Sequence, residues 1–446
     1  MTIHNNFALF SAAILASTLF FAACSDDSSS APEEKTSHEE NASHEEHHGH
    51  HMEEPSEGDL TLGDEDIQDG FIFLQDTTIN GVLTVSTTTP GATVLKNVKV
   101  TGNLLIKRSG RVDFSGSADV VHVGSSNTDV YAFEDEAQVN GHHFMGKNNT
   151  FTTKSFAEYQ NVDWTEKSVD LATGIHLAYT VTGDEKGTPV VLIHGLTDGR
   201  VSWSQVAPSL AKKGYRVYVP EYRGNGKTDK PIDESSYSVA ELASDIAAFV
   251  EKLGLKKVHI VGHSLGAFIA QELSITNAEI VSSITLIGSG ASVDKKNSTL
   301  DWLVNGSDDE SFDGIYAYDS TQKLPESFIQ AWGYSTNPDK DFQAANLEHL
   351  KQVPYYVWKY LVKNLLKIDN TKRLSSIATD VQIIWGSKDA LFDSESQKTL
   401  QKGLSKAKSV VFHEVEGADH NTHWGSAEDV KTVTGYIDEF IKSLKK

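Results

Sequence analysis

The chain has a single cysteine, Cys24, among its 446 residues, and no basic stripe offsets its formal charge of −23. One cysteine excludes an internal disulfide in the folded part, whatever the redox compartment. The acidic balance excludes nucleic acid as a partner, because a polyanion would be repelled. An apolar share of 39% is sufficient for a real core, and the length allows one large domain or two to three ordinary ones.

Large apolar residues are almost missing from residues 24–69. Residues 25–69 contain sixteen Asp or Glu against one base, Lys35, so this stretch carries −15 of the −23 charges. Such a segment cannot bury enough apolar surface to offset the entropy of ordering. We therefore predict a disordered acidic tether over 24–69.

Six histidines interleaved with glutamate lie in this tether: His38, His44, His47, His48, His50 and His51. This composition is able to bind Zn²⁺ or Cu²⁺ weakly and in many geometries. A polar spacer whose histidines bind nothing specific is the alternative interpretation.

An uncharged apolar run, residues 7–23, ends in Phe-Ala-Ala-Cys at Cys24. It resembles a bacterial lipoprotein signal peptide, although no Lys or Arg precedes the run and Phe21 stands where Leu is usual. The resemblance implies a signal peptide over 1–23, lipidation of Cys24, and a chain held on a membrane of the bacterial cell envelope, periplasmic or surface-exposed. An uncleaved anchor is the alternative, but the run is shorter than the roughly 20 residues that a span needs.

Residues 70–155 consist of short Val, Ile, Leu and Thr runs broken by Gly and Asn. Alternation with period two, bounded by turn residues, predicts β-strands. The runs cover 79–85, 98–106, 118–123, 129–133 and 138–144. A Gly-centred turn recurs before an apolar triplet, which favours a small β-solenoid, with a compact β-sandwich as the alternative. A spacer and a binding module fit this β-rich domain equally well.

From residue 168 onward, strands alternate with helices. β-like runs are predicted within 170–181, buried strands at 190–193 and 216–220, and an amphipathic helix over 239–253. Continuous apolar strands separated by helices of this length predict an α/β fold with a mostly parallel sheet covered on both faces.

The stretch 258–268 has the strongest local pattern: a β-branched run, then Gly262-His263-Ser264-Leu265-Gly266, then a helix-permissive sequence. A serine at a sharp strand-to-helix turn has its hydroxyl lifted out of the sheet edge. The two glycines leave room for the crowded backbone of that turn. The pattern predicts a nucleophile elbow.

Residues 168–446 resemble the α/β-hydrolase family through five short motifs in a fixed order: His194-Gly195, Arg223-Gly224-Asn225-Gly226, the pentapeptide around Ser264, Ile383-Ile384-Trp385-Gly386-Ser387-Lys388-Asp389, and Gly417-Ala418-Asp419-His420. The resemblance implies that Ser264 is the nucleophile, Asp389 the acid and His420 the base. It also implies an oxyanion hole formed by the backbone N–H groups of Leu196 and Leu265. The sequence departs from the family at two scaffold positions, with Glu221 in place of Asp and Asp380 in place of Pro.

The chemistry explains why these three residue types are needed together. A serine hydroxyl is a poor nucleophile unless an imidazole removes its proton, and the imidazole needs a carboxylate to fix its tautomer. Asp393 is the fallback acid, and we interpret His423 as a structural or solvent-facing neighbour. Haloalkane dehalogenases and epoxide hydrolases of this family use an Asp nucleophile, so Ser264 argues against both activities. The mechanism needs neither a metal nor an organic cofactor.

A long insertion separates the strand at 284–287 from the strand that begins near residue 382. In the family such an insertion forms a helical cap, which we place at about 293–375, with helical stretches at 327–332 and 355–366. Aromatic side chains at helical spacing either line an acyl pocket or form the cap's own core, and the second is the default. These residues are Phe312, Tyr316, Trp332, Tyr355, Tyr356 and Trp358.

Together these patterns predict a membrane-tethered serine hydrolase that cleaves a carboxylic ester or a similar small acyl compound. Alternatives within enzymes are a C–C bond hydrolase and a cofactor-free haloperoxidase, which share the same three residue types. Another alternative is a surface binding protein in which the β-rich domain acts and the hydrolase fold is inert. The intact set of Ser264, Asp389 and His420 argues against an inert fold.

Overall fold

The computed structural model describes residues 50–51, 56, 58–132, 137–152, 164–307, 312–318 and 324–445. The predicted signal peptide, the lipidation site Cys24 and the side chains of the His-rich tract lie outside this part of the chain. Within it, no helix is both long enough and apolar enough to cross a membrane. The described residues form two β-structures, an N-terminal parallel one and an eight-stranded sheet.

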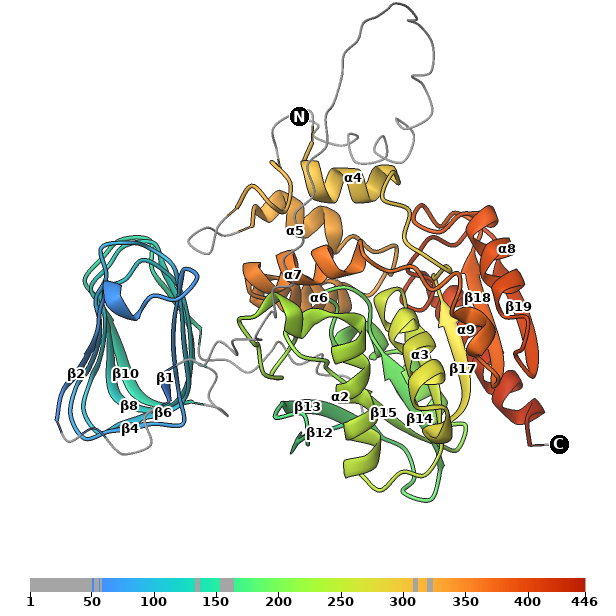
Figure 1. Ribbon diagram of the computed structural model, residues 1–446, viewed down its shortest axis with the longest axis horizontal. Helices are drawn as coiled ribbons and strands as arrows, with labels where there is room; N and C mark the ends of the chain where they lie inside the picture. Colours follow the sequence, from blue (N-terminus) through green and yellow to red (C-terminus); the bar gives the residue numbers. More distant parts are fainter. Residues whose placement is uncertain are drawn as a thin grey trace, which may run out of the picture. The chain divides into compact units, whose positions relative to one another are not determined.

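The N-terminal structure is a parallel β-solenoid, drawn from blue to cyan in Figure 1. The chain returns to the same position one coil later: Val85 pairs with Ile106, Ile106 with Val123, and Val123 with Phe144. The paired Val and Ile side chains are buried and form the solenoid core. The strands are β1 (His50–His51), β2 (Leu60–Leu62), β3 (Phe71–Gln75), β4 (Thr78–Ile79), β5 (Leu83–Val85), β6 (Ala92–Val100), β7 (Leu104–Ile106), β8 (Gly110–Val123), β9 (Thr128–Tyr131), β10 (Ala137–Phe144) and β11 (Thr150–Thr152).

Two runs that read as single strands in the sequence are each two strands in the structure. The first breaks between β4 and β5, and the second breaks between β6 and β7. The breaks are corners of successive coils that stack directly, since a Cβ on Gly102 would lie 2.8 Å from the carbonyl oxygen of Gly81. Alternation along a run does not reveal such a corner, because the apolar period continues through it.

The second structure is the eight-stranded sheet, with strand order β12-β13-β15-β14-β16-β17-β18-β19. β12 pairs antiparallel with β13, and β13 pairs antiparallel with β15, while all later neighbours are parallel. This mostly parallel sheet confirms the predicted fold class. The strands are β12 (Thr165–Asp170), β13 (His176–Thr182), β14 (Thr188–Ile193), β15 (Tyr215–Pro220), β16 (Val258–His263), β17 (Val281–Ile287), β18 (Asp380–Gly386) and β19 (Ser409–Val415).

The two faces of this sheet are buried under different helices (Figure 1). On β14, Val191 and Ile193 belong to the core beneath α2 (Val239–Lys252), α3 (Leu265–Thr276) and α8 (Ser394–Gly403). Val190 and Leu192 belong to the core beneath α1 (Val206–Ala211) and α9 (Ala427–Ser443). A strand buried on both faces has a continuous apolar sequence for this reason.

The described part of the insertion between β17 and β18 includes the α-helices α4 (Ser298–Asn305), α5 (Glu326–Trp332), α6 (Lys340–Gln352) and α7 (Tyr355–Leu365), drawn from gold to orange in Figure 1. Its aromatic side chains pack mainly on one another. Phe312 stacks on Phe328 with ring centroids 4.3 Å apart, and Trp332 meets Trp358 edge to face at 5.7 Å. The apolar interior of these helices therefore accounts for most of these aromatics.

The two departures from the family pattern are accommodated by local partners. Glu221 is fully buried, and its carboxylate lies 3.8 Å from Arg200 and accepts from the amide of Lys227 at 3.3 Å. Burial alone would raise the pKa of Glu221, but the Arg200 charge holds it below its ordinary value. Asp380 accepts from Lys408 at 3.0 Å and from the hydroxyl of Ser409 at 2.6 Å. Both carboxylates are structural.

Candidate active site

Ser264 occupies a strained turn between β16 and α3. Its backbone has φ 51° and ψ −117°, a region that residues other than glycine rarely adopt. A Cβ on Gly262 would collide with the backbone of Gly266, and a Cβ on Gly266 would collide with that of Ile193. The two glycines thus permit the close approach that this turn requires. The serine itself is 8% exposed.

Asp389 and His420 meet at the ends of two neighbouring strands. Asp389 lies in the loop after β18, and His420 lies in the loop after β19. His420 Nδ1 is 3.0 Å from Asp389 Oδ2. The other carboxylate oxygen of Asp389 accepts from the backbone amides of Leu391 and Phe392 at 2.8 and 3.0 Å. A carboxylate only accepts hydrogen bonds, so Nδ1 of His420 carries the proton and Nε2 has a free lone pair.

The electrostatics of this pair favour a more basic imidazole. Burial by itself would lower the pKa of His420, but the negative charge and hydrogen bond of Asp389 raise it, and Asp419 adds to that effect. The net result is a pKa above the ordinary 6.5. The side chain of Asp389 is fully buried and that of His420 is 15% exposed, so water screens their interaction weakly.

The imidazole of His420 is also held by packing. A Cβ on Gly288, which has φ 53°, would lie 3.0 Å from Nδ1 of His420. The ring of Phe392 lies 5.8 Å from the imidazole, centroid to centroid. Gly288 and Phe392 were not identified from the sequence, because only the fold brings the ends of β17 and β18 to His420.

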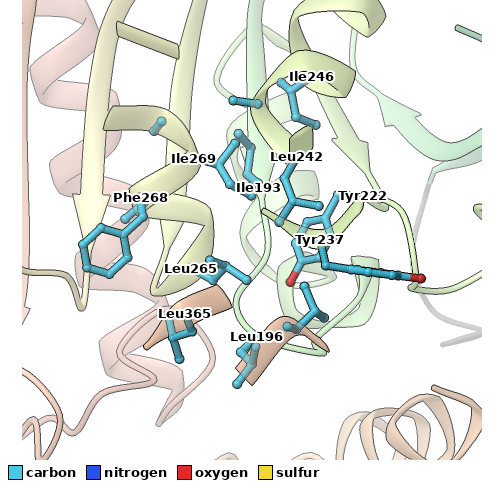
Figure 2. Packing of buried hydrophobic residues seen from close by; sticks show 14 of the residues in the cluster. Ile193, Leu196, Tyr222, Tyr237, Leu242, Ile246, Leu265, Phe268, Ile269 and Leu365 are labelled. Atoms are coloured by element: carbon cyan, nitrogen blue, oxygen red, sulfur yellow. The ribbon is translucent and has the colours of Figure 1, made fainter. Parts of the chain in front are cut away.

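The loop after β14 holds the first predicted oxyanion donor, Leu196. The hydroxyl of Tyr222 donates to the carbonyl of Gly195 at 2.5 Å, and Thr197 has φ 56°, so this loop is fixed in an unusual conformation. Leu265 is the first residue of α3, and amides in the first turn of a helix have no partner within it. Both leucine side chains are buried in one apolar cluster, and Figure 2 shows them there with Leu365 of α7.

The two secondary candidates, Asp393 and His423, make different contacts from Asp389 and His420. Asp393 is the N-cap of α8 and accepts from the amide of Ser396 at 2.8 Å, so its carboxylate is engaged in the helix terminus. His423 is fully buried between Trp203 and Trp424, and neither ring nitrogen has a hydrogen-bond partner among the described residues. Burial holds the pKa of His423 well below 6.5. It is a buried neighbour and is not solvent-facing.

Two further polar residues lie beside the elbow that were not singled out in the sequence. His263 directly precedes Ser264, and its Nε2 lies 3.1 Å from the carbonyl oxygen of His420. Its Nδ1 lies 3.6 Å from Asp198, which follows the His194-Gly195 motif. The sequence signal for a role of His263 was its position between Gly262 and Ser264. The groups that its ring faces come from loops that are far away in the sequence. In the described part of the chain, no group of three or more His, Cys, Asp or Glu residues is placed to hold a metal ion.

Comparisons with known proteins place this geometry in a family. A family model described as alpha/beta hydrolase fold matches residues 188–427. Epoxide hydrolase 1 of Caenorhabditis elegans is 26% identical over 322 residues, which cover 68% of this chain and 77% of that protein. The 2-hydroxy-6-oxononadienedioate/2-hydroxy-6-oxononatrienedioate hydrolase 1 of Pseudomonas putida is 28% identical over 292 residues, covering 61% of this chain and 93% of that one.

A solved structure agrees at the level of the fold. The crystal structure of an esterase from Rhodococcus sp. ECU1013 has a TM-score of 0.52 to this chain at 22% identity, and the match covers 63% of this chain and 99% of the esterase. The family model spans more than half of the sequence and includes the elbow and both loops that carry Asp389 and His420. The chain belongs to the α/β-hydrolase family and is a hydrolase.

Proposed function

We propose that this hydrolase cleaves a carboxylic ester or a similar acyl compound through an acyl-enzyme on Ser264. The observation that carries the proposal is the hydrogen bond between His420 and Asp389, which leaves Nε2 of His420 as the base. A serine on a nucleophile elbow is the group that such a base activates. The curated relatives include epoxide hydrolases, but a serine in place of the aspartate nucleophile argues against that reaction here.

In the proposed reaction, Ser264 Oγ attacks the acyl carbon while His420 Nε2 accepts its proton. The carbonyl oxygen becomes an oxyanion, and the N–H groups of Leu196 and Leu265 are the proposed donors to it. His420 then gives the proton to the leaving alcohol as the acyl–oxygen bond breaks. Water attacks the acyl-enzyme with His420 as base again, and the acid product leaves with Ser264 restored.

The apolar character of Leu196, Leu265 and Phe392 around the site suits an uncharged acyl chain. The experiment is to measure kcat/KM of the purified protein on p-nitrophenyl esters of graded acyl length, with Ser264→Ala as the control. We expect turnover by the wild type, a clear optimum of acyl length, and no turnover by the variant. Equal turnover by both proteins would exclude Ser264 as the nucleophile.

A C–C bond hydrolase is the second candidate, because the relative from Pseudomonas putida is matched over 93% of its length. The same serine and histidine are compatible with both reactions, so the substrate preference of the enzyme distinguishes them. A 2-hydroxy-6-oxodienoate offered beside the preferred ester separates them. A kcat/KM on the dienoate that exceeds the value on every ester would replace the esterase proposal.

We also propose that lipidated Cys24 holds this enzyme on a membrane of the bacterial cell envelope, with the acidic tether as a spacer. The support is the apolar run before Cys24 and the acidic segment after it. The full-length chain is expressed in a bacterial host, and its envelope fractions are compared with those of Cys24→Ser. Loss of the lipid-modified form in the variant is expected, whereas an unprocessed chain of unchanged mass in both would indicate an uncleaved anchor.

A further inference from the structure

His263 joins two loops that the proposed mechanism depends on. It is the last residue of β16, it is 2% exposed, and Ser264 follows it. Its ring reaches the backbone of His420 on one side, 3.1 Å from the carbonyl oxygen, and Asp198 of the oxyanion loop on the other, 3.6 Å from the carboxylate. One buried side chain thus connects the loop that carries the proposed base, His420, to the loop that carries the proposed oxyanion donor Leu196.

Both groups that face this ring are hydrogen-bond acceptors. A carbonyl oxygen only accepts, and an ionised carboxylate only accepts. A neutral imidazole has one N–H, so whichever tautomer it adopts, one unprotonated ring nitrogen faces an acceptor. One additional proton removes this conflict, because an imidazolium donates on both sides and a protonated carboxyl group donates to Nδ1. The distance of 3.6 Å is within the range of an ion pair and longer than a hydrogen bond.

We propose that His263 is a positioning residue for His420 and that His263 and Asp198 together hold one proton between them. With that proton the pair is neutral overall, and Nε2–H of His263 donates to the carbonyl of His420 and fixes the loop that aims the imidazole at Ser264. This inference rests on the proposed use of His420 as the base. The contact between the two side chains also explains why residue 195 is a glycine, since a Cβ there would lie 2.6 Å from Asp198 Oδ2 and 2.8 Å from His263 Nδ1.

The other titratable groups around the pair come from four elements. His420, Asp419 and His423 lie in the loop after β19, His194 at the end of β14, Tyr222 in the loop after β15, and His349 on the cap helix α6. His194, His349 and His423 have pKa values lowered by burial. Burial also lowers the pKa of His263 itself, although the carboxylate of Asp198 acts in the opposite direction. Burial raises the pKa of Tyr222 well above 10. His194, His349, His423 and Tyr222 are neutral near pH 7. The charged groups around the pair are Asp389 and Asp419, which act on His420, and Glu221 and Arg200, which act on His349.

The first test removes the donor. His263→Leu should lower kcat by about 100-fold with KM near the wild-type value, because the base is misaimed while substrate contacts remain. His259→Leu is the matched control: it lies on the same strand, is buried, and bonds Ser283 at 2.7 Å, at the end away from Ser264. A kcat that is retained in His263→Leu, or that falls equally in His259→Leu, would overturn the positioning role.

The second test asks whether the pair holds a proton. An amide at position 198 donates to Nδ1 of a neutral ring, so Asp198→Asn should keep kcat near the wild-type value, whereas the isosteric Asp198→Leu should lose it. The protonated His263–Asp198 pair of the wild type and the pair of His263 with the introduced asparagine in the variant are both neutral. The decrease of kcat/KM at low pH should therefore occur at the same pH in Asp198→Asn and in the wild type. A decrease displaced to lower pH in the variant would mean that Asp198 faces a neutral ring as a lone charge, and the shared proton would be wrong.

These outcomes separate this inference from the proposed function. If Ser264→Ala retains turnover, the serine mechanism itself fails. If Ser264→Ala abolishes turnover while His263→Leu does not lower it, only the role of His263 fails. His263→Gln provides a further readout if the leucine variant does not fold, since its amide N–H still reaches an acceptor and should restore most of kcat.

Discussion

The solenoid is built from parallel strands and the eight-stranded sheet from mostly parallel ones, yet the polar side chains of the two structures make different kinds of contact. In the solenoid, Asn148 donates to Asn127, and Asn140 donates to Asp119, each 21 residues earlier in the chain. Each of these side chains thus bonds to a residue of the preceding coil. In the sheet, the strands end side by side, so the polar residues of different loops converge and meet partners of another kind, as His420 meets Asp389.

Backbone conformation makes the same distinction. In the solenoid, the described non-glycine residues with positive φ are all Asp or Asn, which tolerate the left-handed region through local hydrogen bonds. In the eight-stranded sheet and its loops they are Thr197 and Ser264, which have no such preference. The surrounding structure holds Thr197 and Ser264 in these unfavourable backbone conformations, and both residues lie beside the proposed reaction centre. The difference agrees with the proposal that the reaction centre lies in the loops of the eight-stranded sheet.

The largest expected effect comes from the converging residues. Ser264→Ala and His420→Ala should each lower ester turnover by up to the order of 10⁶, and the double variant should be no worse than either one, because each change disables the same step. Steady-state kinetics on the preferred ester measure this. Effects that multiply in the double variant would mean that the two residues act in separate steps.

A smaller loss is expected at the acid. Asp389→Asn should lower kcat by about 10⁴, because an amide does not fix the required tautomer of His420. The matched control is Asp393→Asn, four residues later, which should leave kcat unchanged and weaken only the N-cap of α8. A reversed order of these two effects would identify Asp393 as the acid.

The pH dependence follows from the raised pKa of His420. Only the neutral imidazole accepts the proton of Ser264, so kcat/KM should fall as pH decreases through this pKa, with a midpoint above 6.5. In Asp389→Asn the negative charge that raises the pKa is gone, and the residual activity should persist to lower pH. A wild-type midpoint well below 6.5 would contradict the role of Asp389.

The smallest effect is expected in the solenoid. Asn148→Ala should reduce the free energy of unfolding by about 1 kcal/mol through the lost amide bond and the positive φ of 57°, and kcat should not change. Asn148→Gly keeps the backbone conformation and loses only the bond, so it should be less destabilising. Denaturant unfolding and ester turnover, measured on the same samples, test both statements. A loss of turnover would give the solenoid a part in catalysis.

The sequence was sufficient for the main outline of the fold. The parallel sheet, its helices and the elbow were predictable because apolar runs, helical periodicity and the glycines around Ser264 are local features. The corner between β6 and β7 was missed, since Val98 to Ile106 keep one alternating pattern through it. Placing Asp198 and Gly288 beside the candidate site needed three dimensions, because their partners His263 and His420 lie far along the chain.

The most direct test of the central claim is to find where a fluorophosphonate reacts. Intact-protein and peptide mass spectrometry after labelling should place one adduct on Ser264 in the wild type, a greatly slowed adduct in His420→Ala, and none in Ser264→Ala. Stoichiometric labelling at another residue, or no labelling of a folded wild type that also leaves every ester intact, would contradict the claim that the residues converging at the ends of these strands form a serine hydrolase.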